Sequence, residues 1–157
     1  MQKKYLFFFV TTVPIILLDQ ITKAYISSTM PLHESFVVIE GFFNITYIRN
    51  PGAAFGFLRC ASPAFRHIFF LSAGTIALLL ILYYIRKSRE LPLTFALSLI
   101  LSGAVGNLID RVRFGDVVDF LDVYIGTYHW PAFNVADSAI SIGATILILI
   151  ILKQKKE

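Results

Sequence analysis

The sequence is poor in charge, in cysteine and in residues grouped to bind a metal. Only 15% of its 157 residues are charged, and Cys60 is its single cysteine. No intramolecular disulfide can therefore form, and cysteine usage does not indicate the compartment. The histidines lack metal-ligand spacing and no His-Glu-x-x-His pattern occurs, which argues against a zinc enzyme. We expect neither a metal nor a cofactor.

The chain is instead rich in long uncharged stretches. It is 57% hydrophobic, contains 15 Phe, and has a mean hydropathy of +0.73. Residues 68–85 and 91–109 carry no charge, residues 5–26 are interrupted only by Asp19 and Lys23, and residues 133–152 only by Asp137. A bilayer core needs roughly 20 apolar residues per helix. A soluble protein could bury one such helix, but four would leave it too little polar surface. The sequence predicts one membrane domain, 1–157, with spans at about 5–27, 66–85, 91–110 and 134–152.

The basic residues indicate the orientation of these spans. Three short segments outside them hold eight of the 14 Lys and Arg residues: Lys3, Lys4, Arg86, Lys87, Arg89, Lys153, Lys155 and Lys156. The much longer segment 28–65 holds only Arg49 and Arg59. The positive-inside rule then places both termini in the cytoplasm and the loops 28–65 and 111–133 outside. Because the basic residues follow the membrane sides, the net charge of +4 does not indicate nucleic-acid binding.

The N-terminal run could also be a cleaved signal peptide, since two lysines precede its apolar stretch. Asp19 and Lys23, however, stand where a cleavage region should be small and neutral. We therefore expect a retained span.

Both outer loops carry structural signals. Residues 37–49 are rich in β-branched and aromatic residues, and from residue 43 they alternate between apolar and polar, which predicts strand. Phe43, Ile45 and Tyr47 would share one face, with Asn44 and Thr46 on the other. A turn at residues 50–52 would end this small β element. The second loop would lie at headgroup level, with its aromatic rings in the interface: Phe120, Tyr124, Tyr128 and Trp130.

Two spans contain polar residues that are costly in lipid. Asp19 and Lys23 stand four residues apart on one helix face, and the simplest interpretation is a self-neutralised pair with the Lys23 amine reaching toward water. In the third span, Gly103 and Gly106 would permit close helix approach, but packing does not explain Asn107. Intramembrane ionisable residues mark functional sites by default.

The predicted topology brings these polar residues to the outer level of the membrane. Asn134 and Asp137 open the last span, where they could form a helix-capping pair. Asp119 and Asp137 could also act together, because two close carboxylates share a proton. One would then activate a water while the other polarises a peptide carbonyl. Residues 121–132 must fold back to bring the pair together.

Four motifs in this order resemble a known family. They are residues 19–23 (DQITK), 49–56 (RNPGAAFG), 103–111 (GAVGNLIDR) continuing to 115–120 (GDVVDF), and 133–138 (FNVADS). The chain resembles the lipoprotein signal peptidases (signal peptidase II), membrane aspartic proteases that process prolipoproteins, over nearly its whole length.

The resemblance implies a fold and a set of site residues. The fold would be an all-α integral membrane protein of four transmembrane helices, with a small extracytoplasmic β-cradle and a mobile outer segment. Asp119 and Asp137 would be the catalytic pair. The residues that line or support the site would be Asn50, Gly52, Asn107, Arg111 and Asn134, together with Asp19, Lys23 and Asp110.

The resemblance also implies a substrate and a location. The substrate would be a prolipoprotein whose cysteine already carries a diacylglyceryl group, cut on the amino side of that cysteine. The enzyme would be a monomer in the bacterial cytoplasmic (inner) membrane, in contact with membrane lipid and with its active site toward the extracytoplasmic face. It would bind globomycin-type inhibitors.

Three alternatives follow from the residues alone. A small proton or ion carrier with an intramembrane carboxylate relay would place carboxylates at several depths. A non-catalytic assembly subunit would tolerate Asn in place of Asp119 and Asp137. A Ser–Lys peptidase would pair Lys23 with Ser27, one helical turn further on.

Overall fold

The computed structural model describes residues 2–52, 57–58 and 60–155. Residues 53–56 of the second motif, together with Arg59 and Lys156, lie outside the described residues. The elements follow one another as α1 (Gln2–Thr29), β1 (Ser35–Ile39), β2 (Phe43–Asn50), α2 (Pro63–Lys87), α3 (Leu91–Phe114), β3 (Val117–Ile125), β4 (Tyr128–His129) and α4 (Val135–Gln154).

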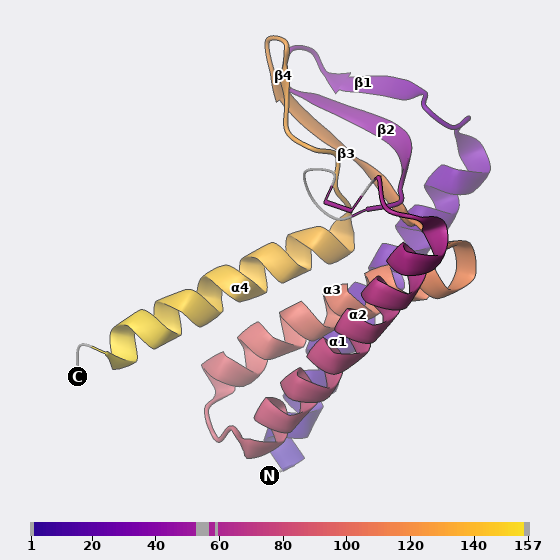
Figure 1. The fold of residues 1–157 in the computed structure, drawn as a ribbon. Coiled ribbons are helices and arrows are strands. Elements are labelled where there is room, and N and C mark those ends of the chain that lie inside the picture. Colours follow the sequence, from indigo (N-terminus) through magenta and orange to yellow (C-terminus); the bar gives the residue numbers. More distant parts are fainter. Residues whose placement is uncertain (1, 53–56, 59, 156–157) are drawn as a thin grey trace.

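The four helices lie side by side as a bundle, and the strands gather at one end of it (Figure 1). Each helix is long and apolar enough to cross a membrane. The predicted fold class, an integral membrane protein of four helices with a small antiparallel sheet, is therefore confirmed. Both ends of the described chain lie at the end of the bundle opposite the sheet (Figure 1).

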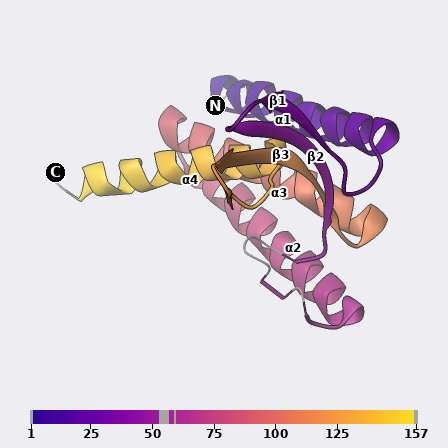
Figure 2. The same cartoon turned by 90° about the horizontal axis from the view of Figure 1, so that it is seen from above.

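Helix α3 is the centre of the bundle. It packs against α1, α2 and α4, and the view from above places α1 and α2 on opposite sides of it (Figure 2). Its glycines allow this close packing, as predicted. A Cβ atom at Gly103 would collide with the backbone carbonyl of Ala136, and one at Gly106 would lie 2.5 Å from the Asp19 carboxylate.

The helix ends explain where the spans start and stop. Gly115 adopts the left-handed conformation, with φ of 81°, and its N–H bonds to the carbonyl of Arg111, so α3 continues to Phe114. At the other end of the bundle, the Lys4 amine caps the C-terminus of α2. It donates to the carbonyl oxygens of Ile85, Arg86 and Ser88 at 2.8, 3.0 and 2.9 Å.

The strands form an antiparallel sheet in the order β1-β2-β3-β4. The predicted alternation in β2 holds up to a register shift between Ile45 and Ile48, and Tyr47, which lies within this shift, is buried. The polar residues Asn44 and Thr46 are buried as well, and each makes a side-chain hydrogen bond to a neighbouring strand. Asn44 donates to Asp122 at 2.9 Å, and Thr46 accepts from the Ser35 hydroxyl at 2.9 Å.

One expectation for the second outer loop is wrong. The Phe120 ring is not exposed to an interface but is buried in a core cluster with Ile26, Tyr47 and Val118. The reason is that this part of the loop is strand β3, which pairs with β2 and packs against the end of α1. Tyr128 and Trp130, beyond the end of β3, are exposed.

Candidate active site

Asp119 is a buried side chain held by two asparagine amides. It lies on β3 and is only 2% exposed. Asn134 donates to Oδ1 at 2.7 Å, and Asn50 donates to Oδ2 at 3.0 Å. Burial and, secondarily, the nearby carboxylate of Asp137 raise the pKa of Asp119 to about 7. Asp119 therefore exchanges a proton near neutral pH.

Asp137 lies in the first turn of α4, where a third asparagine holds it. Asn107 on α3 donates to Oδ1 of Asp137 at 2.7 Å. As predicted, Asn134 caps this helix: its side-chain oxygen accepts the backbone N–H of Asp137 at 2.9 Å. Asn134 thus contacts both acidic residues, through its amide nitrogen to Asp119 and through its oxygen to the backbone of Asp137.

Both carboxylates line one cavity of about 990 Å³. The segment between them folds back as predicted: the chain passes through β4 and returns, and Leu121 and Phe133 exchange backbone hydrogen bonds of 2.8 and 3.0 Å. Four other predicted site residues share the lining, which are Asn50, Gly52, Asn107 and Arg111. The remaining four predicted residues are buried behind the cavity and do not line it: Asp19, Lys23, Asp110 and Asn134.

The Lys23 amine does not reach toward water, so that expectation is wrong. Its side chain is 3% exposed and donates to three oxygen atoms. These belong to Asp19 at 2.9 Å, Asp110 at 3.1 Å and the Asn107 side chain at 2.9 Å. An ammonium group has three N–H donors, so this arrangement satisfies all of them. The amine also fixes the Asn107 amide, whose nitrogen is thereby directed at Asp137.

The two carboxylates beside Lys23 connect distant parts of the chain. Asp19 accepts the backbone N–H of Ala136, in the first turn of α4, at 2.9 Å. Asp110 accepts the backbone N–H of Val118, next to Asp119, at 3.1 Å. The Gln20 amide bridges Asp19 and Asp110 at 3.1 and 3.2 Å. Gln20 was not predicted as a site residue, although an uncharged polar residue within a span was a usable signal.

Arg111 secures the turn that carries Asn50. Its guanidinium donates to the carbonyl of Gly52 at 2.7 Å and lies 4.0 Å from the ring centroid of Phe70. The Gly52 N–H in turn bonds to the Asn50 side chain at 3.0 Å. Phe70 lines the cavity and was missed, because nothing in the sequence distinguishes it from the other Phe residues.

The positions of these side chains also bear on two other mechanisms, a metal-dependent one and that of a Ser–Lys peptidase. Among the described residues, no three His, Cys, Asp or Glu side chains are grouped to hold a metal ion. Lys23 is ion-paired with Asp19 and Asp110, and the exposed Ser27 hydroxyl donates to the carbonyl of Ala24. A Ser27–Lys23 pair is therefore not formed.

The fold and the site together define a multi-pass membrane protein with two acidic side chains in a cavity beneath its sheet. The family model described as signal peptidase (SPase) II matches residues 11–153. A lipoprotein signal peptidase of Syntrophus aciditrophicus is 57% identical, with 100% of this chain and 99% of that protein aligned. One of Geobacter sulfurreducens is 52% identical, with 90% and 88% aligned. A solved bacterial membrane enzyme superposes with a TM-score of 0.86 at 40% identity, covering 94% of this chain and 88% of its own.

The chain belongs to the signal peptidase II family. It is accordingly a membrane-embedded protease.

Proposed function

We propose that this protein is an aspartic endopeptidase that removes signal peptides from diacylglyceryl-modified prolipoproteins. It cuts on the amino side of the lipidated cysteine, and Asp119 and Asp137 are its catalytic residues. Membership of the signal peptidase II family supports the removal of signal peptides from prolipoproteins. The observation that carries the aspartic chemistry is the shared cavity of Asp119 and Asp137, each held by asparagine donors.

The two carboxylates have different protonation states and therefore different catalytic roles. Protonated Asp119 donates a hydrogen bond to the carbonyl oxygen of the scissile peptide, while ionised Asp137 takes a proton from the attacking water. The resulting hydroxide adds to the carbonyl carbon, and the proton is then passed to the leaving amine as the C–N bond breaks. The raised pKa of Asp119 and the place of Asp137 in the first turn of α4, where N–H groups favour negative charge, support this division.

The other predicted residues position these groups. Asn50, Asn107 and Asn134 orient the carboxylates, while Lys23, Asp19 and Asp110 fix Asn107 and the starts of β3 and α4. Arg111 and Gly52 hold the Asn50 turn against α3. These contacts fix the positions of the acidic side chains before a substrate binds.

The location of the site suits a lipidated substrate. The cavity lies between the outer ends of the helices and the sheet, so acyl chains can remain in the bilayer while the peptide meets the carboxylates. The basic residues at the opposite end of the bundle support cytoplasmic termini and an extracytoplasmic site in the inner membrane. We propose that the enzyme acts as a monomer and that globomycin-type inhibitors bind in this cavity.

The ion-conducting alternative is not favoured. Its carboxylate relay would have to continue across the membrane. The carboxylates of Asp19, Asp110, Asp119 and Asp137 instead gather at the end of the bundle covered by the sheet. Family membership points to proteolysis as well.

The direct test of the function is cleavage of a purified diacylglyceryl-modified prolipoprotein by the protein in detergent. We expect mass spectrometry to find the new N-terminus at the lipidated cysteine, with no effect of a metal chelator or a serine-protease inhibitor. The matched control is the same precursor without its diacylglyceryl group, which should not be cut. Cleavage at another bond, or inhibition by the chelator, would contradict the proposal.

The pKa of Asp119 makes a prediction about pH. Since catalysis uses protonated Asp119 and its pKa is about 7, kcat/KM should fall roughly tenfold per pH unit above that value. The measurement is the initial cleavage rate from mildly acidic to mildly alkaline pH at subsaturating substrate, with folding monitored at each pH. A rate that stays constant throughout the alkaline range would show that Asp119 is not the proton donor.

A further inference from the structure

The cavity that holds the two carboxylates has two chemically different groups of lining residues. One group comes mainly from the end of β2, the turn after it and α3, and it includes polar and charged side chains such as Asn50 and Arg111. The other group comes from the segment 130–133 and from residues 138–142 of α4, and it carries no charge. The polar group holds the carboxylates in place, whereas the uncharged group has no part in the proposed chemistry.

Two large apolar side chains of the uncharged group are exposed although they line the cavity. Trp130 follows β4 and is 60% exposed, and Ile142 lies in α4 and is 56% exposed. Helix α4 is long and apolar enough to cross a membrane, so an exposed side chain on it faces lipid. The cavity therefore extends from Trp130, beside the sheet, to the lipid-facing surface of α4 at Ile142.

The hairpin of β3 and β4 fixes the backbone at Trp130. The N–H of Trp130 bonds to the carbonyl of Val123 at 2.9 Å. The preceding residue, His129, stacks on the Tyr124 ring with the ring centroids 4.7 Å apart, and the Tyr124 hydroxyl accepts the N–H of Gly41 at 3.0 Å. An indole on a fixed backbone has only two side-chain torsions to order, so it can contact a ligand at a small cost in conformational entropy.

We propose that Trp130 and Ile142 bind the diacylglyceryl group of the substrate cysteine, an inference that rests on the proposed function. The Trp130 ring packs against the glyceryl unit and the first carbons of the acyl chains, and one acyl chain passes Ile142 into the bilayer. Indole rings favour the headgroup level of a membrane, which suits the position of Trp130 beside the sheet. The peptide lies along the polar lining, so different groups of residues bind the two parts of the substrate.

The apolar segment of the signal peptide is the rival occupant of this lining, and the geometry favours the lipid. The bond to be cut directly precedes the lipidated cysteine, so the glyceryl unit is only a few bonds from the carbonyl carbon that is attacked. The signal peptide needs a surface as long as a membrane span. On α4, however, the cavity lining extends from Asp137 to Ile142, which lies about two turns from the start of the helix.

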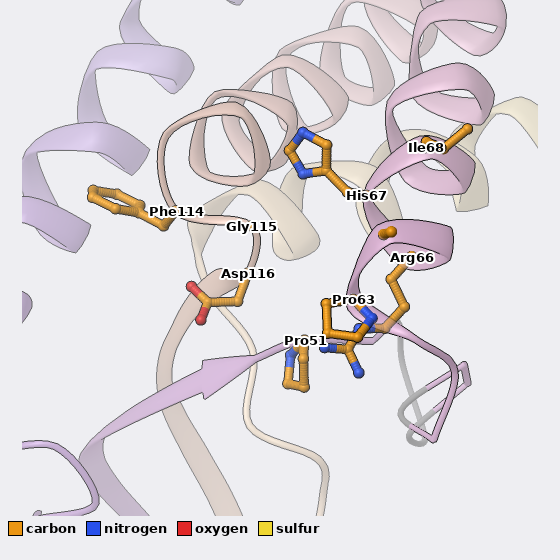
Figure 3. Close-up of a pocket in the computed structure, with 9 residues that line it drawn as sticks. Pro51, Pro63, Arg66, His67, Ile68, Phe114, Gly115 and Asp116 are labelled. Atoms are coloured by element: carbon orange, nitrogen blue, oxygen red, sulfur yellow. The ribbon is translucent and has the colours of Figure 1, made fainter.

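The smaller cavity beside the first turns of α2 is a separate feature. It has a volume of about 510 Å³ and is lined by residues of α2, of the end of α3 and of the segment after each (Figure 3). Its ionic side chains do not converge on one point, and Asp116 is already ion-paired with Arg49 at 3.0 Å. The diacylglyceryl group is therefore assigned to the larger cavity.

The test is fluorescence quenching, because Trp130 is the only tryptophan of the chain. It uses the full-length Asp119→Asn variant, which leaves the precursor uncut, and a diacylglyceryl precursor without tryptophan. Bromine atoms, which quench indole fluorescence at short range, are placed either near the glyceryl end of the acyl chains or in the apolar segment of the signal peptide. We expect strong quenching by the first precursor and little by the second. A phospholipid with the same brominated chains, at equal concentration, controls for lipid that reaches Trp130 from the detergent micelle.

Cleavage kinetics test the same contact in the active protein. Trp130→Ala should raise KM for the lipidated precursor about tenfold with little change in kcat, as for the loss of one large aromatic contact. Trp130→Phe should recover most of the affinity because it keeps a ring. Ile142→Asn should raise KM more for long acyl chains than for short ones. The matched control is Tyr128→Ala, since Tyr128 is 87% exposed on the same hairpin but does not line the cavity, and this variant should behave as wild type.

The possible outcomes separate this inference from the proposed function. Quenching from the signal peptide instead of the acyl chains would assign the lining to the peptide and overturn the inference. Equal quenching by the control phospholipid, or an unchanged KM in Trp130→Ala, would overturn it as well. In each of these cases cleavage of the lipidated precursor by the wild type would still support the proposed function. A wild-type protein that does not cut this precursor would overturn both.

Discussion

Replacing either Asp119 or Asp137 with asparagine is expected to abolish cleavage while leaving the protein folded. Asparagine keeps the shape of the side chain but neither takes a proton from water nor donates one to a peptide carbonyl. The loss should be about 10³-fold or more in kcat, because general acid–base catalysis by one group contributes roughly 10² to 10⁴. The double variant should be no slower than either single one, since the two carboxylates act as a unit.

The stability of the Asp119→Asn variant can be predicted separately. The pKa of Asp119 in the folded protein, about 7, is above its ordinary value of 3.8. The folded protein therefore binds this proton more tightly than the unfolded one, so ionisation costs stability as pH rises between these values. The asparagine side chain of the variant carries no charge. Above neutral pH, Asp119→Asn should therefore avoid the loss of folding stability that ionisation of Asp119 causes in the wild type.

The matched control for these variants is Asp122→Asn. Asp122 lies on the same strand as Asp119 and is also buried, but it bonds to Asn44 and His129 and does not line the cavity. The Asp122→Asn variant should cleave the precursor at nearly the wild-type rate. If Asp119→Asn and Asp137→Asn both still cut the lipidated precursor, the assignment of the catalytic pair is wrong.

Replacing Lys23 with methionine is expected to destabilise the protein by about 3–5 kcal/mol, the usual effect of removing one partner of a buried ion pair. Methionine fills a similar volume but leaves Asp19 and Asp110 buried without their shared cation. It also releases the Asn107 amide, so cleavage should decline in the fraction that remains folded. The measurement is unfolding in mixed micelles by titration with sodium dodecyl sulfate.

Two further variants separate charge from packing. Lys153→Met, at the exposed end of α4, should have almost no effect on the unfolding midpoint. Adding Asp110→Asn to Lys23→Met removes one of the two uncompensated carboxylate charges and should recover part of the lost stability. If Lys23→Met unfolds at the same point as Lys153→Met, the Lys23 amine is hydrated, contrary to the contacts described above.

The sequence was sufficient for the fold class and for most of the polar residues near the site, although Gln20 was missed. Uncharged runs separated by basic residues predict the four helices, because the bilayer fixes both the length and the polarity of a span. The cost of polar groups in lipid identified Asp19, Lys23, Asn107 and Asp137 as residues that needed partners.

The sequence was insufficient where the partner comes from another element. The i, i+4 spacing of Asp19 and Lys23 is visible in the sequence, but Asp110 lies on another helix. Only the three-dimensional structure therefore shows that protein atoms, and not water, bind the Lys23 amine. Phe120 was misplaced for the same reason, because strand pairing in β3 turns it toward the core. Phe70 is informative only through its contact with Arg111.

The hydrogen bond between Asp19 and the backbone of Ala136 joins the first membrane helix to the last, across 117 residues of sequence. During synthesis, the ribosome makes α1, α2 and α3 before α4 is available. Asp137, Asn134 and the anchor point for Asp19 all belong to the last part of the chain to be inserted. On the proposed assignment, a nascent chain that ends before α4 lacks one of the two catalytic carboxylates, so cleavage would begin only after α4 is inserted.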